Sequence, residues 1–125
     1  DGSYDCFLDK GTYLPMMYME DAINGTVQLM EAKESNIKIR TSYNLAAIIF
    51  SLYEISDIIC KHLPDFKIKY EPDYRQKIAD SWPDSIDDTP AREDWGWQHK
   101  YDLDNMVEDM LTNLSERKGK PTSVT

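Results

Sequence analysis

The chain has 125 residues, the size of a single domain, and its composition of 41% hydrophobic and 30% charged residues is ordinary for a globular protein. The formal net charge of −9 repels phosphate backbones and anionic headgroups, so we expect neither nucleic-acid nor membrane binding. No apolar run approaches the roughly 20 residues that a membrane-spanning helix needs.

Extended and helical patterns follow one another in the first third of the chain. Two extended segments, residues 6–8 and 14–19, flank a polar turn at residues 9–12, and we expect the second segment to be an unbroken buried strand. A helix follows, and the spacing predicts that its buried face consists of Met19, Ala22, Ile23, Thr26, Val27 and Met30. Gly25 inside this helix costs up to about 1 kcal/mol relative to Ala, which suggests close packing.

The middle of the chain predicts strand, helix and strand. Alternation over residues 37–43, followed by the apolar run 45–50, indicates a strand that enters the core. Ser51 and Glu54 stand in capping-box positions at the start of a helix. We expect this helix to bury Leu52, Ile55, Ile58, Ile59 and Leu63. Residues 66–70 alternate again, which predicts a strand with one solvated face.

The last third is predicted to be mostly loop as far as Thr89. Thr89 is a plausible helix cap with Pro90 in the first helical position, and Gly96 is the expected left-handed stop of this short helix. Asp102 or Asp104 caps the final helix. Its apolar stripe is Leu103, Met106, Val107, Met110, Leu111 and Leu114.

No self-contained active site is visible in the sequence. The glycines are scattered, so no phosphate-binding loop is encoded, and no Tyr is followed four residues later by Lys. We expect Cys6 and Cys60 to be reduced buried thiols, and we expect no metal, because no set of four ligands has zinc-site spacing. His62 and His99 lie outside recognisable motifs and are expected at the surface. The acidic cluster of Asp84, Asp87 and Asp88 fits turn and cap chemistry better than a calcium loop.

Candidate binding residues lie between the last predicted strand and the final helix. Arg75 either contacts a ligand or ties down local carbonyls. Trp82 precedes a proline in a loop, where it either covers a ligand or pins the loop as an apolar plug. Arg92 is expected to pair with a neighbouring acid, and Trp95 and Trp97 are expected in the core.

The same region carries the longest motif in the chain. Residues 73–83 read Asp-Tyr-Arg-Gln-Lys-Ile-Ala-Asp-Ser-Trp-Pro, residues 85–88 read Ser-Ile-Asp-Asp, and residues 91–97 read Ala-Arg-Glu-Asp-Trp-Gly-Trp. This pattern resembles the C-terminal third of the short-chain-type L-threonine 3-dehydrogenases, the NAD-dependent, zinc-free, epimerase-like members of the extended short-chain dehydrogenases. The likeness covers about residues 2–115.

The resemblance implies an α/β fold composed of the last Rossmann elements and a small mixed α/β substrate-binding lobe. We therefore expect one lobe over residues 1–116 and a flexible tail over residues 117–125. In this interpretation the N-terminal Rossmann half, which binds NAD and carries the catalytic Ser/Thr and Tyr-xxx-Lys groups, is absent, and this chain alone is inactive. Residues 45–50 would then keep an uncovered apolar face.

The resemblance also implies a reaction. The intact protein, expected to be a homodimer of the cytoplasm or, in a eukaryote, of the mitochondrion, would oxidise L-threonine to 2-amino-3-oxobutanoate with NAD. Trp82 matches the tryptophan of the family's substrate-closing loop, and Arg75 matches an arginine of that loop. Two alternatives stay open. The first is the lobe of a nucleotide-sugar epimerase or dehydratase, although the acidic residues Asp80, Asp84, Asp87 and Asp88 disfavour a diphosphate ligand. The second is a non-catalytic binding module.

Overall fold

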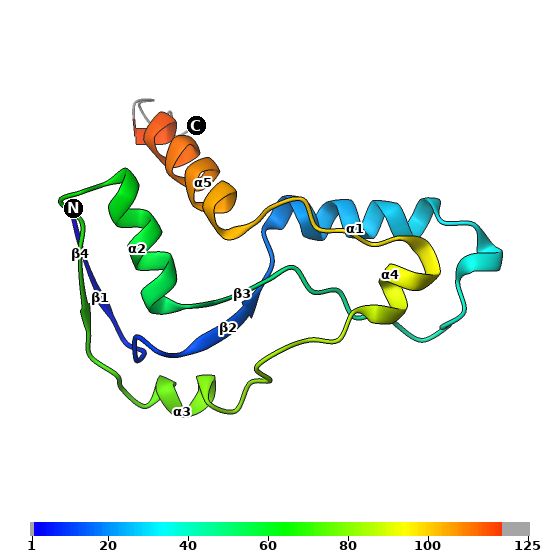
Figure 1. The fold of residues 1–125 in the computed structure, drawn as a ribbon, viewed down its shortest axis with the longest axis horizontal. Helices are drawn as coiled ribbons and strands as arrows, with labels where there is room; N and C mark the ends of the chain where they lie inside the picture. Colours follow the sequence, from blue (N-terminus) through cyan, green and yellow to red (C-terminus); the bar gives the residue numbers. More distant parts are fainter. Residues whose placement is uncertain (1, 119–125) are drawn as a thin grey trace, which may run out of the picture.

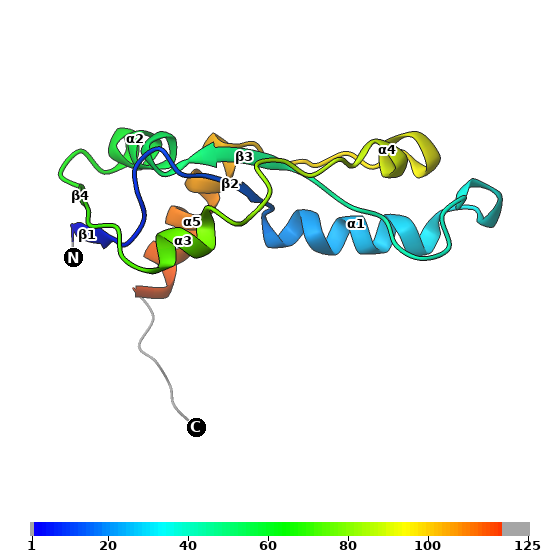
Figure 2. The same ribbon diagram turned by 90° about the horizontal axis from the view of Figure 1, so that it is seen from below.

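The computed structural model describes residues 2–118, which form a flat and elongated molecule (Figures 1 and 2). The elements in chain order are β1 (Ser3–Cys6), β2 (Tyr13–Met16), α1 (Met19–Glu31), the 3-10 helix η1 (Glu34–Asn36), β3 (Ile48–Ser51), α2 (Leu52–His62), β4 (Lys67–Tyr70), α3 (Arg75–Ala79), α4 (Thr89–Trp95) and α5 (Leu103–Lys118). This mixed α/β content agrees with the fold class expected from the sequence.

The strands form two separate pairs. β1 runs parallel to β4, with Ser3 opposite Lys67, and β2 runs antiparallel to β3, with Met16 opposite Ile48. The prediction of an unbroken buried strand over residues 14–19 is wrong, because β2 ends at Met16 and only Leu14 of this strand is buried. The remaining two positions before α1 carry the chain from the strand into the helix.

Residues 37–47 form no strand, which corrects the prediction of one continuous strand into the core. The hydroxyl of Tyr43 accepts the backbone N–H groups of Lys38 and Ile39 at 3.0 and 3.1 Å, so this segment closes on itself. A strand also needs a neighbour for its ladder, and within residues 2–118 no strand pairs with this segment. Only residues 48–51, opposite β2, become a strand.

The second and last predicted helices form where local capping chemistry starts them. The hydroxyl of Ser51 accepts the backbone N–H of Glu54, whose carboxylate accepts the backbone N–H of Ser51, so the capping box is complete. Asp102, one of the two expected caps, accepts the backbone N–H of Asn105 at 2.8 Å. α5 then continues to Lys118, past the predicted start of the tail at residue 117, and residues 119–125 lie outside the described residues.

α2 and α5 pack on β3 to make the larger of two cores. Its buried residues are Ile48, Phe50, Ile58, Met106 and Val107. The apolar stripe of α5 is covered only at its N-terminal end, because Met110 and Leu114 remain exposed. Leu63 of the predicted α2 stripe is exposed as well, and so is Ile49, which lies between the buried residues Ile48 and Phe50 of β3.

α1 packs on the side opposite to the one predicted. Met19, Ile23, Val27 and Met30 are exposed, whereas Asp21 and Gly25 are buried. Asp21 accepts the backbone N–H groups of Lys100 and Tyr101 at 2.8 and 3.0 Å, so the segment before α5 binds to this face. Periodicity identifies an apolar stripe but not whether this polypeptide covers it.

α4 lies beside the C-terminal half of α1, and the chain that follows α4 runs back along α1 to α5 (Figure 1). Gly96 ends α4 in the left-handed conformation with φ of 78°, as expected, whereas the N-cap is Asp88 rather than Thr89. Trp97 is fully buried and its indole N–H donates to the carbonyl of Ala46 at 3.0 Å. Trp95 packs edge-on against Tyr43, so both tryptophans are structural, as expected.

Candidate functional site

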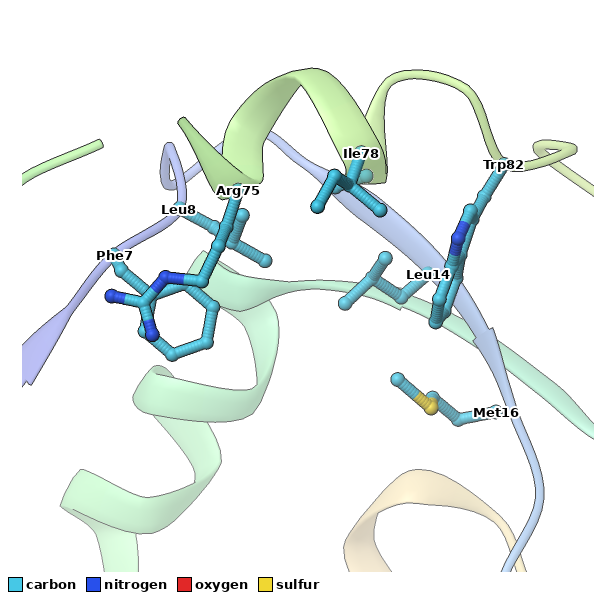
Figure 3. Close-up of a pocket in the computed structure, with 8 residues that line it drawn as sticks. Phe7, Leu8, Leu14, Met16, Arg75, Ile78 and Trp82 are labelled. Atoms are coloured by element: carbon cyan, nitrogen blue, oxygen red, sulfur yellow. The ribbon is translucent and has the colours of Figure 1, made fainter. Parts of the chain in front are cut away.

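An apolar pocket of about 320 Å³ lies between α3 and β2 (Figure 3). It is lined by Phe7, Leu8, Leu14, Met16, Arg75, Ile78, Ala79 and Trp82. Leu8 and Leu14 are buried with Cys6 in the smaller of the two cores, so the floor of the pocket is part of a packed unit. The structure thus brings the two candidate residues of the sequence, Arg75 and Trp82, to one site.

α3 was not predicted, because residues 75–79 make only a short helix inside a stretch that reads as loop. Hydrogen bonds to residues 7–12 of the same chain hold α3 in place. The backbone N–H of Asp73 donates to the carbonyl of Phe7 at 3.2 Å. The side-chain amide of Gln76 accepts the backbone N–H of Asp9 at 2.7 Å and donates to the hydroxyl of Thr12 at 2.9 Å. Gln76 therefore joins α3 to the turn between β1 and β2.

Arg75 is held by one carboxylate and one aromatic ring. Its Nε lies 3.0 Å from both oxygens of Asp73, and its Nη2 lies 2.6 Å from Oδ2. The guanidinium carbon stands 3.4 Å from the centre of the Phe7 ring, which is stacking distance. The hydrogen bond from Arg75 lowers the pKa of Asp73 below its usual value. The charge of the Arg75 guanidinium is therefore balanced by Asp73, and its orientation in the pocket wall is fixed.

Trp82 stands at the opposite wall of the pocket. Its backbone N–H donates to the carbonyl of Ala79 at 3.0 Å, which turns the chain back after α3. Figure 3 shows the indole extending from that turn toward Leu14 and Met16. The side chain is half exposed. An indole in this position can close over a small apolar group and exclude water from it.

The walls suit a ligand or a neighbouring apolar group of modest size, with a fixed cation at one end. They do not make a catalytic centre, since within the described part of the chain the lining side chains include no Tyr, His, Cys, Ser or carboxylate. Across residues 2–118 no three His, Cys, Asp or Glu side chains are grouped to hold a metal ion. None of the helices in that range is long and apolar enough to cross a bilayer.

The other polar residues considered in the sequence have structural partners. Arg92 forms a bidentate pair with Asp88, with its Nε at 2.9 Å from both carboxylate oxygens, as expected for a residue paired with a neighbouring acid. Asp87 accepts the backbone N–H of Thr89 at 3.0 Å, which is the turn chemistry expected of the acidic cluster. Cys6 is buried and Cys60 partly buried, and both are free thiols.

The residues of the site that were not singled out from the sequence include Phe7, Leu14, Met16 and Gln76. Leu14 and Met16 alternate along β2, so both can face one side, and this period-two signal was present but was assigned to a buried strand. Phe7 and Gln76 make contacts between residues more than 60 positions apart in the sequence: Gln76 accepts the N–H of Asp9, and Phe7 stacks on Arg75. Local sequence patterns carry no signal for such contacts.

The fold of this chain is that of the C-terminal portion of an extended short-chain dehydrogenase. It matches the crystal structure of L-threonine dehydrogenase from Phytophthora infestans with a TM-score of 0.88 and 48% identity, over 93% of this chain and 38% of that one. No protein-family model matches the chain.

Its homologues are L-threonine 3-dehydrogenases and members of the epimerase/dehydratase family. The mitochondrial L-threonine 3-dehydrogenase of Sus scrofa is 46% identical over 112 residues, which are 89% of this chain and 30% of that protein. An uncharacterized epimerase/dehydratase of Staphylococcus aureus is 45% identical over 118 residues, which are 94% of this chain and 37% of that protein. The chain thus spans about a third of the length of these relatives.

Proposed function

We propose that this chain is the substrate-closing lobe of an NAD-dependent L-threonine 3-dehydrogenase, which oxidises the 3-hydroxyl of L-threonine to give 2-amino-3-oxobutanoate. The observation that carries the proposal is that Arg75 and Trp82 line one pocket in a chain 48% identical to an L-threonine dehydrogenase. The catalytic groups belong to the N-terminal portion, so the chain alone has no activity. The full protein is proposed to act as a homodimer in the cytoplasm or, in a eukaryote, in the mitochondrion.

The residues of this chain do not by themselves fit NAD. A dinucleotide pyrophosphate requires a glycine-rich turn at a helix N-terminus, and no helix within residues 2–118 begins with one. Gly25 lies inside α1, where it faces Leu45 and Trp97. We therefore assign the cofactor mainly to the N-terminal portion. Trp82 would shield the threonine methyl group from water, and Arg75 would keep the wall beside Phe7 in place.

A nucleotide-sugar substrate is the alternative, and the uncharacterized epimerase/dehydratase relative is the observation in its favour. A nucleotide diphosphate would need free cations. The cation that lines this pocket, Arg75, is already bound by Asp73 through both carboxylate oxygens. Threonine carries a single carboxylate in place of a diphosphate, so it needs fewer free cations, and this difference supports threonine over a nucleotide sugar.

The test is a full-length chimera in which this chain replaces the matching portion of the Phytophthora infestans L-threonine dehydrogenase. We expect NADH formation from L-threonine by the chimera and none by the 125-residue chain alone. A chimera that folds, binds NAD and turns over only a nucleotide sugar would establish the alternative. A folded, NAD-binding chimera without any turnover would favour a non-catalytic module.

Site variants of the chimera refine the test. Trp82→Ala should lower kcat/KM about 10- to 100-fold, because misplacement and water entry act on the reacting geometry, whereas Trp82→Phe should keep most activity. Tyr53→Ala is the matched control, since Tyr53 is an exposed aromatic of α2 that does not line the pocket. Arg75→Lys should change KM more than kcat, because Lys cannot reproduce the stacked bidentate pair.

A further inference from the structure

Arg75 is the one charged side chain among the described residues that line the pocket between α3 and β2. The other lining side chains are aliphatic or aromatic, apart from the thioether of Met16. Figure 3 shows the guanidinium at one end of the pocket, over the ring of Phe7 and away from Trp82. A guanidinium at the end of an apolar pocket is the group that a phosphorylated ligand would bind. The charge available at Arg75 therefore bears on which substrates the pocket admits.

Asp73 occupies one edge of this guanidinium. Its Oδ2 lies 2.6 Å from Nη2 and 3.0 Å from Nε of Arg75. The pair uses the N–H donors of that edge, and the ring of Phe7 covers one face of the guanidinium plane. The donors that remain belong to a cation whose charge is already balanced. A carboxylate with a single charge can bind to them, whereas a diphosphate would bring several negative charges close to Asp73.

Asp73 also has a local structural role. Its Oδ1 accepts the backbone N–H of Arg75 at 2.8 Å, and this turn leads the chain into α3. An asparagine has the same side-chain oxygen and can accept the same N–H, but it carries no charge. A glutamate carries the charge, but its longer side chain does not form this turn in the same geometry. The two roles of Asp73 can therefore be separated by substitution.

Overall similarity does not decide the substrate class. The L-threonine 3-dehydrogenase of Sus scrofa and the uncharacterized epimerase/dehydratase of Staphylococcus aureus are 46% and 45% identical to the matching parts of this chain. One fold can hold different substrates, so the choice depends on the residues of the site. The apolar walls of the pocket suit many small groups. The charge state of its cationic end is the feature that distinguishes a zwitterionic amino acid from a phosphorylated substrate.

We propose that Asp73 is a specificity-determining residue, an inference that rests on the proposed function: by neutralising Arg75 it excludes phosphorylated ligands and leaves the pocket to L-threonine. Asp73 acts through Arg75 and does not touch the reacting atoms, so it is a positioning residue. The hydrogen bond between the two side chains lowers the pKa of Asp73 and raises that of Arg75, so both are charged at neutral pH. Their side chains are 37% and 41% exposed, so water screens the pair and we expect an effect of moderate size.

The test is the binding of inorganic pyrophosphate to the full-length chimera described above, measured by titration calorimetry with saturating NAD so that the dinucleotide site is filled. Asp73→Asn removes the charge and keeps the turn, whereas Asp73→Glu keeps the charge. Asp84→Asn is the matched control, because Asp84 is an exposed acid that does not line the pocket and its loss changes the net charge equally. The double variant Asp73→Asn with Arg75→Gln shows whether a gain in affinity depends on Arg75. The same variants are titrated in the 125-residue chain without NAD.

We expect Asp73→Asn to bind pyrophosphate about tenfold more tightly than the parent, and Asp73→Glu and Asp84→Asn to bind it as weakly as the parent does. The gain should vanish in the double variant and should shrink as the salt concentration rises, because added ions screen the charges. In the Asp73→Asn chimera, pyrophosphate should raise the KM for L-threonine and leave kcat unchanged.

Equal affinities of the parent and Asp73→Asn for pyrophosphate would overturn the proposal. A gain that persists in the double variant would show that it does not act through Arg75, with the same consequence. A gain shared by Asp73→Glu would assign the effect to the lost turn instead of the charge, and one shared by Asp84→Asn would assign it to net charge alone. Either result would also overturn the proposal.

The outcomes separate this proposal from the proposed function, because calorimetry requires no turnover. A gain in pyrophosphate affinity for Asp73→Asn in a chimera that does not oxidise L-threonine would support the exclusion of phosphorylated ligands and reject the function. Oxidation of L-threonine by a chimera in which Asp73→Asn brings no gain would support the function and reject the role of Asp73.

Discussion

Replacement of Gly25 by Ala should destabilise the chain, although Ala is the better helix former. A Cβ at this position would lie 2.7 Å from Cδ1 of Leu45 and 3.0 Å from Cζ3 of Trp97. Helix propensity favours Ala by up to about 1 kcal/mol, and overpacking costs about 1–3 kcal/mol. Leu45 can rotate away, but the fully buried Trp97 has no space to move. We therefore expect a net loss of about 1–2 kcal/mol in the free energy of unfolding.

Urea denaturation followed by tryptophan fluorescence measures this loss. Gln28→Ala, at a solvent-exposed position of the same helix, is the control and should stay within about 0.5 kcal/mol of the parent. The double variant Gly25→Ala with Leu45→Ala removes one of the two clashes, so it should be more stable than the sum of the single effects. A Gly25→Ala chain that is more stable than the parent would refute the packing explanation.

Substitutions at four further positions test other contacts. Asp21→Ala should cost about 2–4 kcal/mol, because two backbone N–H groups lose the buried carboxylate as their acceptor. Asp21→Asn should cost less, and equal urea midpoints for the two variants would contradict this. Ser51→Ala should cost about 1 kcal/mol through loss of the helix cap. The N–H and hydroxyl of Ser51 lower the pKa of Glu54, so its stabilising contribution is present above the unfolded pKa of about 4.3 and is lost as the pH falls through the lower folded value. Glu54→Gln should remove that part of the acid sensitivity, and an unchanged pH profile would argue against it. Gln76→Leu deprives the N–H of Asp9 of its acceptor, so limited proteolysis should cut the β1–β2 turn faster, and an unchanged cutting rate would show that Gln76 does not secure α3.

The homologous relation was visible in the sequence because the motif over residues 73–97 is long and unusual, and the comparisons confirm the similarity. The binding roles of Arg75 and Trp82 remain predictions. Gln76, which accepts the backbone N–H of Asp9 from 67 residues away, is one of the contacts that join α3 to this pocket. No local pattern encodes such a contact, and for the same reason α3 reads as loop in the sequence.

The sequence by itself determined the elements whose causes are local. The capping box at Ser51 and the left-handed stop at Gly96 act within one turn of backbone, so they can be identified before any fold is known. For the last helix the sequence offered Asp102 or Asp104, and the structure selects Asp102. Only the tertiary structure decided which side of α1 is covered and that residues 37–47 form no strand in this chain. Both depend on which surfaces meet: an apolar stripe is buried, and a strand is paired, only where other polypeptide lies against it.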